Sequence, residues 1–110
     1  MATTYKNAQV QGTSGLTTYA TLYNTGASTT AVISTILVTN TTNAPVQYRI
    51  AIMGSAGTPA NPNFIVYDDT VAANDVVAFT VGITLGNTQF IRVSSSANTI
   101  GFNAFISEIS

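Results

Sequence analysis

Alternation of apolar and polar residues is the clearest pattern along this chain. From Val46 to Ile52 every second residue is apolar, while Gln47 and Arg49 lie between them. The same period of two recurs over 99–107, where the apolar residues are Ile100, Phe102, Ala104 and Ile106. This period is typical of a β-strand that packs one face against a core.

Another apolar stripe spans 77–85, and the residues between its members are small. The side chains expected on one face of this strand are Val77, Phe79, Val81, Ile83 and Leu85. Gly82 lies in the middle of the run. A glycine at this place indicates a bulge, or a close packing contact against Phe79 or Phe102.

Segments rich in Asn, Asp, Gly and Pro separate the apolar runs and predict turns. The expected strands are 6–11, 16–23, 31–39, 46–53, 64–70, 76–85, 90–95 and 99–108. Seven to eight short strands in 110 residues predict an all-β fold, a single β-sandwich of the immunoglobulin-like or jelly-roll type. We expect the sandwich to cover 16–110. The polar stretch 1–15 is expected to be an N-terminal arm that lies on a neighbouring subunit.

The chain carries very little charge. Charged residues make up 6% of the sequence, against about 25% in a typical domain, and the net charge is −1. Three basic residues cannot build a phosphate-binding surface or a polybasic membrane anchor. The apolar-rich run 31–38 is far shorter than the ~20 residues of a membrane span, and 1–10 lacks the apolar stretch of a signal peptide. We therefore expect neither nucleic acid nor membrane as a partner.

Hydroxyl and amide side chains replace the missing charge. Such a surface repels a copy of itself only weakly, so the composition favours a homo-oligomer. The sequence contains no His, Cys or Trp. The absence of His and Cys excludes Ser-His-Asp triads, thiolate nucleophiles and zinc or copper sites. We expect a protein that is not an enzyme and holds no cofactor.

Several segments, taken in order, carry a resemblance to a known group. They are AVISTILVTN (31–40), YRIA (48–51), IVYDDTVAAND (65–75), TVGITL (80–85) and FNAFISEI (102–109). Over about residues 20–110 the chain resembles small virion structural proteins of tailed bacteriophages, including those that infect cyanobacteria. These segments are strand and turn patterns rather than catalytic motifs, and no functional residue is carried over from the group.

The resemblance implies a non-enzymatic component of the virus particle that is made in the host cytoplasm. The favoured function is a capsid decoration (cement) protein, bound to the major capsid protein at the capsid surface. A trimer is favoured because it matches the local threefold positions of an icosahedral shell. The alternatives are a small tail, neck or baseplate protein, and a carbohydrate- or receptor-binding β-sandwich module.

Four residues are candidates for an interface. Arg49 and Arg92 lie on predicted strands among apolar residues, where each forms either a surface ion pair or a pair with Asp69 or Glu108 across a subunit boundary. Tyr19 and Tyr23 are four residues apart, which places them on one face of a strand. They suit an interface or a carbohydrate-stacking patch, although the absence of Trp counts against sugar binding.

Three carboxylates offer the oxygen ligands that Ca²⁺ prefers, namely Asp68, Asp69 and Asp75. Adjacent residues of a strand point to opposite faces, so Asp68 and Asp69 are not expected to converge. Asp75 follows Asn74 in a predicted turn, where a carboxylate commonly caps local backbone. The sequence therefore favours no metal site at these residues.

Overall fold

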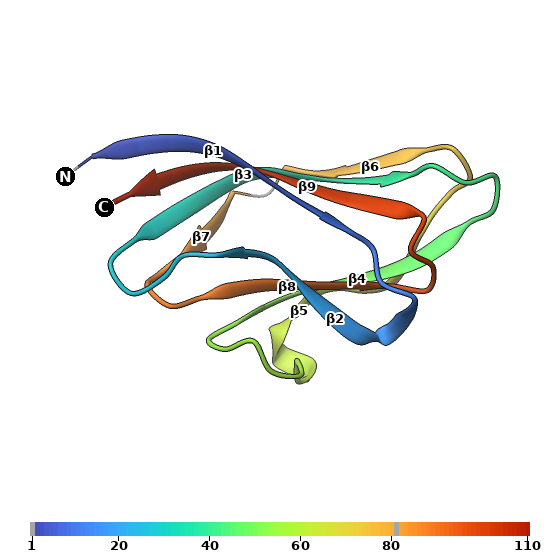
Figure 1. The fold of residues 1–110 in the computed structure, drawn as a ribbon, viewed down its shortest axis with the longest axis horizontal. Coiled ribbons are helices and arrows are strands. Elements are labelled where there is room, and N and C mark those ends of the chain that lie inside the picture. The colour runs from blue at the N-terminus through green and yellow to red at the C-terminus, as the bar shows by residue number, and fades with distance from the viewer. Residues whose placement is uncertain (1, 81) are drawn as a thin grey trace.

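The chain folds into two antiparallel sheets that face each other (Figure 1). The computed structural model describes residues 2–80 and 82–110. The five-stranded sheet contains, in spatial order, β1 (Thr3–Gln11), β9 (Ile100–Ile109), β3 (Thr30–Asn40) and β6 (Val76–Phe79), with β7 (Ile83–Leu85) also paired to β3. The four-stranded sheet contains β2 (Gly15–Asn24), β8 (Phe90–Ser95), β4 (Val46–Met53) and β5 (Phe64–Val71). The expected all-β sandwich is confirmed.

The order of the strands identifies the type of sandwich. The chain crosses between the sheets at most connections, and β9 returns to lie between β1 and β3. With β6 and β7 counted as one edge strand, the order β1-β9-β3-β6 facing β2-β8-β4-β5 is that of a jelly roll. The fold is therefore a jelly roll and not the immunoglobulin-like alternative. A 3₁₀ turn at Asn61–Asn63 precedes β5, and no helix in the described part of the chain is long and apolar enough to cross a membrane.

The strand expected over 76–85 is divided into β6 and β7, so residues 2–80 and 82–110 form nine strands. Gly82 lies in the division and has a φ of 65°, a left-handed conformation that favours glycine. Apart from its chain neighbours, no described residue has an atom within 4 Å of the place where a Cβ would stand, so the expected close packing against Phe79 or Phe102 is wrong. Val81, expected to face inward, lies outside the described residues.

The N-terminal segment differs from the expected arm. β1 pairs with β9 without interruption, from Thr3 opposite Ile109 to Gln11 opposite Gly101. Its inward side chains Ala8 and Val10 pack against the core. Residues 3–11 therefore belong to the sandwich of their own chain, and the sheet shows no boundary between 1–15 and 16–110; Met1 lies outside the described residues.

The core lies between the two sheets. It contains Tyr48, which is fully buried and meets Phe79 and Phe102 edge to face at ring-centroid distances of 6.1 and 6.3 Å. Besides Tyr48 and Phe102, the large apolar side chains that are fully buried among the described residues are Ile33, Ile36, Val38, Ile50, Val71, Leu85, Ile91, Val93 and Ile100. Tyr48 is one of the alternating residues between Val46 and Ile52, and the prediction that this face packs against the core is confirmed.

Gly12 joins the two sheets at the end of β1, and it leaves no room for a side chain. A Cβ there would overlap Ser95 Oγ and stand 2.8 Å from Ile100 Cγ1, and both residues are buried. We expect Gly12→Ala to lower the free energy of unfolding by about 1–3 kcal/mol through overpacking, measured by urea denaturation. The matched control is Gly101→Ala, whose Cβ meets no atom within 4 Å and which should stay within about 0.5 kcal/mol of the wild type. Equal stability of the two variants would contradict the prediction.

Candidate functional site

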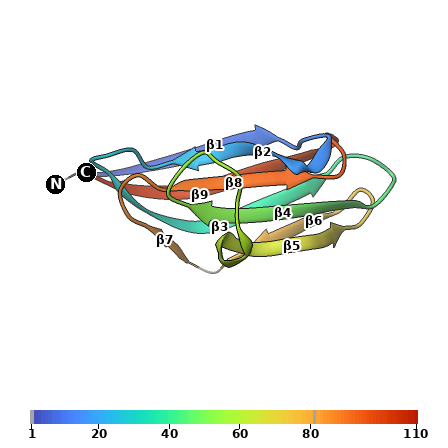
Figure 2. The same ribbon diagram turned by 90° about the horizontal axis from the view of Figure 1, so that it is seen from below.

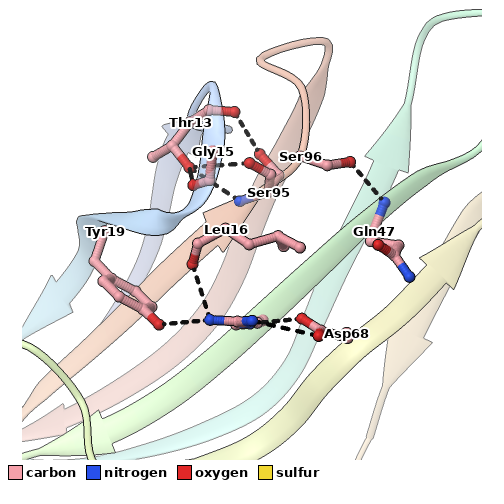
Figure 3. A network of polar contacts seen from close by, with 9 residues as sticks. Thr13, Gly15, Leu16, Tyr19, Gln47, Asp68, Ser95 and Ser96 are labelled. Carbon is pink, nitrogen blue, oxygen red and sulfur yellow. Dashed lines mark hydrogen bonds and ion pairs between the residues drawn. The ribbon is translucent and has the colours of Figure 1, made fainter.

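Arg49 on β4 is the centre of a polar network on the outer face of the four-stranded sheet. Its Nε donates to Asp68 Oδ1 at 2.6 Å and its Nη2 to Asp68 Oδ2 at 3.3 Å. Its Nη1 donates to the Tyr19 hydroxyl at 3.1 Å and to the Leu16 carbonyl at 3.2 Å. Figure 3 shows Leu16, Tyr19 and Asp68 gathered at this point. The Asp68 carboxylate holds the pKa of Arg49 above its ordinary value, so this guanidinium stays charged.

An irregularity in β5 creates the Arg49–Asp68 pair. The register between β4 and β5 shifts between Tyr48 and Ile50, and Asp68 adopts a φ of 55°. Asp tolerates this left-handed conformation better than most residues. Asp68 thereby turns to the outer face, while Asp69 accepts a hydrogen bond from the buried Tyr48 hydroxyl at 3.0 Å. The carboxylate partner of Arg49 is therefore Asp68 of the same chain, not the expected Asp69 or Glu108.

Aromatic rings surround the guanidinium. The Arg49 Cζ lies 4.2 Å from the centroid of the Tyr67 ring and 5.9 Å from that of Phe64. Phe64 meets Tyr67 edge to face at 4.9 Å and Tyr19 at 6.3 Å. Cation–π contacts of this kind contribute about 0.5–2 kcal/mol. Tyr67 is 58% exposed, so one face of this group remains open to solvent.

Arg92 lies on the same outer face, on β8. Its Nη1 donates to Thr21 Oγ1 at 2.7 Å and its Nη2 to the Tyr19 carbonyl at 3.4 Å. The register of β2 shifts between Gly15 and Ala20, and the bulged segment 16–19 supplies acceptors to both arginines. Arg49, Arg92 and Tyr19 are thus brought together. In the described structure they hold a bulge of their own chain in place.

Tyr23 does not share a face with Tyr19, and that prediction is wrong. A second register shift in β2, between Thr21 and Tyr23, inserts one residue and turns Tyr23 toward the core, where it is 7% exposed. Its hydroxyl donates to the Glu108 carboxylate, and Lys6 Nζ lies 3.3 Å from Glu108 Oε2. Burial raises the pKa of Tyr23, and the hydrogen bond to Glu108 and the negative charge of Glu108 raise it further.

The three carboxylates considered for Ca²⁺ have separate partners. Asp68 pairs with Arg49, Asp69 accepts from Tyr48, and Asp75 accepts from the backbone N–H of Val76 at 2.8 Å. Asp68 and Asp69 therefore do not converge, as expected, although the register shift in β5 and not regular alternation sets the orientation of Asp68. Across residues 2–80 and 82–110, no three metal-ligating side chains form a group.

The outer face of the five-stranded sheet has a different character. Burial alternates along β9, with Phe102, Ala104 and Ile106 inward and Phe105 outward. The outward positions are the odd-numbered residues of β1 and β9 and their partners on β3, and we call this surface the uncharged face. None of these described positions carries a charged residue. Exposed apolar side chains on it are Tyr5 (81%), Val32 (39%) and Phe105 (40%).

A shallow groove crosses the uncharged face. It has a volume of about 710 Å³, and its lining includes Gly101 of β9 together with its strand partners Gln11 on β1 and Thr39 on β3. Its lining combines polar residues, such as Gln9, Thr39 and Asn103, with the apolar residues Val10, Ile100 and Phe102. This surface was not identified as a site from the sequence. Two features of the sequence pointed to it: the odd-numbered residues of β9 carry no charge, and the whole chain has few charged residues.

Comparisons with known proteins identify no family. No protein-family model and no curated protein matches the sequence. Among solved structures, the chain is similar to a chain in the structure of infectious bursal disease virus, Gx strain, with 13% identity and a TM-score of 0.49. The match covers 98% of this chain and 37% of that chain, so this chain spans less than half of its length. At this identity and score, the similarity carries no inference about function.

Proposed function

We propose that this chain is a non-enzymatic virion structural protein that decorates an assembled capsid through its uncharged face. The observation that carries the proposal is the separation of charge between the two outer faces. Arg49, Arg92 and Asp68 lie on the four-stranded sheet, whereas the described outward positions of β1, β9 and β3 hold no charged residue. Charged residues are depleted at interface cores because an unpaired charge is costly to bury.

The sequence resemblance and the type of fold also support this proposal. Segments over residues 20–110 resemble small virion proteins of tailed bacteriophages. Jelly rolls also occur in viral capsid and lectin domains, which is an argument from analogy of fold. The proposed partner is the major capsid protein, and copies of this chain are proposed to associate with one another. Because a ligand that binds only the assembled shell stabilises that shell, decoration strengthens the capsid by mass action.

The test introduces one charge on each outer face. Val32 on the uncharged face is 39% exposed, and Ile65 on β5 is 45% exposed, so Val32→Glu and Ile65→Glu are matched. Virus particles are assembled with each variant, sedimented, and analysed for retained protein. Val32→Glu should lower retention more than about tenfold, because a buried unpaired carboxylate costs several kcal/mol. Ile65→Glu should retain wild-type occupancy.

The salt dependence of attachment and the position of the protein in the particle also test the proposal. Wild-type attachment should change little up to about 1 M NaCl, where the Debye length is near 3 Å, because the proposed contact contains no ion pairs. Release in proportion to the logarithm of salt concentration, or full retention of Val32→Glu, would contradict the proposal. A cryo-EM map of the particle distinguishes a capsid position from the tail, neck or baseplate alternatives.

A carbohydrate-binding module is the second candidate, and the aromatic group on the four-stranded sheet favours it. Tyr19, Phe64 and Tyr67 lie together beside the Arg49–Asp68 pair, and Tyr67 is open to solvent. Glycan-array binding that is lost in Tyr67→Ala but kept in Val32→Glu would support this function in place of capsid decoration.

A further inference from the structure

The edge strands of this sandwich differ in how they are protected from pairing with another chain. β2 and β5 each contain two register shifts, and the remaining edge is divided into β6, of four residues, and β7, of three. Bulges and short strands are the features by which proteins block edge pairing. β1 has neither feature, because it forms nine consecutive pairs with β9 and no register shift. Figure 2 shows β1 at the rim of the molecule.

The free edge of β1 presents a regular row of unpaired backbone groups. Ala2 and Ser110 exchange two backbone hydrogen bonds of 2.9 and 3.1 Å, and the Gly12 N–H donates to the Ile100 carbonyl at 2.7 Å. Hydrogen-bonded and non-hydrogen-bonded pairs alternate along an antiparallel ladder. The even-numbered residues of β1 therefore bond to β9. The N–H and C=O groups of the odd-numbered residues point away from β9, and these residues are Thr3, Tyr5, Asn7, Gln9 and Gln11.

Side chains leave this edge open. All five odd-numbered residues are exposed, and they belong to the uncharged face. The charged residue of the strand, Lys6, is even-numbered and lies within ion-pair distance of Glu108 of its own chain. Charged side chains on an edge strand commonly prevent pairing with another chain. The charged residue of β1, Lys6, instead pairs with Glu108 of its own chain and is not one of the outward, odd-numbered residues.

We propose that β1 pairs antiparallel with β1 of a second copy of this chain, about a two-fold axis at Asn7. In this register the odd-numbered residues of both copies face one another, so their free N–H and C=O groups are satisfied together. Tyr5 stands opposite Gln9 of the partner subunit and Lys6 opposite Ala8 of the partner subunit, so no like charges meet. The two five-stranded sheets become one sheet, and their uncharged faces become continuous.

Self-pairing follows from the sequence of β1 itself, TTYKNAQVQ. A two-fold contact needs a surface that is complementary to itself. The free edge of β1 is complementary to itself when the two-fold axis passes through Asn7. The contact is two-fold, in place of the three-fold contact expected from the sequence. The β1–β1 contact involves no capsid component, so its test is independent of the test of the proposed decoration function.

The first experiment removes a single outward N–H. In Asn7→Pro the missing donor faces the free edge, so the ladder to β9 is kept while the contact with the second copy is blocked. Asn7→Ala is the matched control. It loses the same side-chain hydrogen bonds, to Asn103 Oδ1 and the Ala104 carbonyl, but keeps the N–H. Circular dichroism of both variants checks that the sandwich is folded.

Sedimentation equilibrium at micromolar to millimolar concentration measures the result. The wild type and Asn7→Ala should have twice the chain mass of 11.4 kDa, and Asn7→Pro should have the mass of one chain. A wild type with the mass of one chain or of three chains at every concentration would overturn the proposal. A folded Asn7→Pro with the mass of two chains would also overturn it.

A second measurement decides the register, even if Asn7→Pro does not fold. The natural sequence contains no Cys. Asn7→Cys places two thiols across the two-fold axis at a hydrogen-bonded pair with a Cα–Cα distance of about 5.5 Å, which a disulfide spans. In Gln11→Cys, eight residues separate the equivalent positions, or about 27 Å at ~3.4 Å per residue. Mild oxidation should cross-link Asn7→Cys and leave Gln11→Cys uncross-linked, and cross-linking of neither or of both would overturn the pairing at Asn7.

Discussion

Replacing Arg49 with methionine is expected to lower the free energy of unfolding by about 2–4 kcal/mol. The Arg49 side chain is 12% exposed and that of Asp68 is 34% exposed. Breaking a fully buried pair costs about 3–5 kcal/mol, and partial exposure of the carboxylate lowers this value. Methionine fills part of the volume, but it leaves the Asp68 carboxylate, the Leu16 carbonyl and the Tyr19 hydroxyl without their donor.

Arg92→Met is the matched control for Arg49→Met, because Arg92 lies on the same face and its partners among the described residues are a hydroxyl and a carbonyl, not a carboxylate. We expect it to cost less than about 1.5 kcal/mol. Asp68→Asn keeps the size of the side chain and tolerates the left-handed φ. A double-mutant cycle of Arg49→Met and Asp68→Asn should give a coupling free energy of about 1–2 kcal/mol by urea denaturation. Additive effects of the two substitutions would show that the pair does not stabilise the fold.

The alternation of apolar and polar residues predicted most of the fold. The bounds expected for β4 and β8, 46–53 and 90–95, agree with the structure residue by residue. These strands lie inside their sheet, where burial of one face favours a period of two, and this period is clear from Val46 to Ile50 of β4. A bulge at Gly82 was one alternative from the sequence, but the division into two strands was not predicted, because the apolar stripe continues on both sides of Gly82.

Register shifts explain why the candidate site was predicted only in part. A period of two placed Tyr19 and Tyr23 on one face, but one inserted residue in β2 turned Tyr23 into the core. A shift in β5 likewise gave Arg49 its partner Asp68. A bulge depends on how two neighbouring strands pair. The apolar and polar pattern of one strand does not show this pairing, so it does not predict the bulge.

That the N-terminal segment belongs to the sheet was not predicted from the sequence, because its own apolar pattern is weak. Only Ala8 and Val10 of β1 pack against the core, so the segment has a weak apolar pattern and resembles a free arm. Its order comes from nine residue pairs with β9, whose own pattern is strong. Backbone pairing with a neighbour, rather than burial of its own side chains, holds this strand in the sandwich.

Raising the pH above about 10 is expected to destabilise the sandwich steeply, because two buried tyrosines must remain protonated. Tyr48 is fully buried and Tyr23 is 7% exposed. Burial is the largest cause that raises the pKa of each hydroxyl, followed by its hydrogen bond to a carboxylate, Asp69 for Tyr48 and Glu108 for Tyr23. The folded chain therefore keeps both protons at a pH where the unfolded chain has lost them.

The sign and size of the effect follow from proton linkage. A pKa that is raised in the folded state gives stability that is complete below pH ~10 and is lost as the pH rises toward the folded-state pKa. Each tyrosine should remove about 1.4 kcal/mol per pH unit, and the two together about 2.7 kcal/mol. Urea denaturation between about pH 9 and pH 12 measures this slope. Tyr23→Phe and Tyr48→Phe should each reduce it by about half, and an unchanged slope in the double variant would show that other groups cause the alkaline loss.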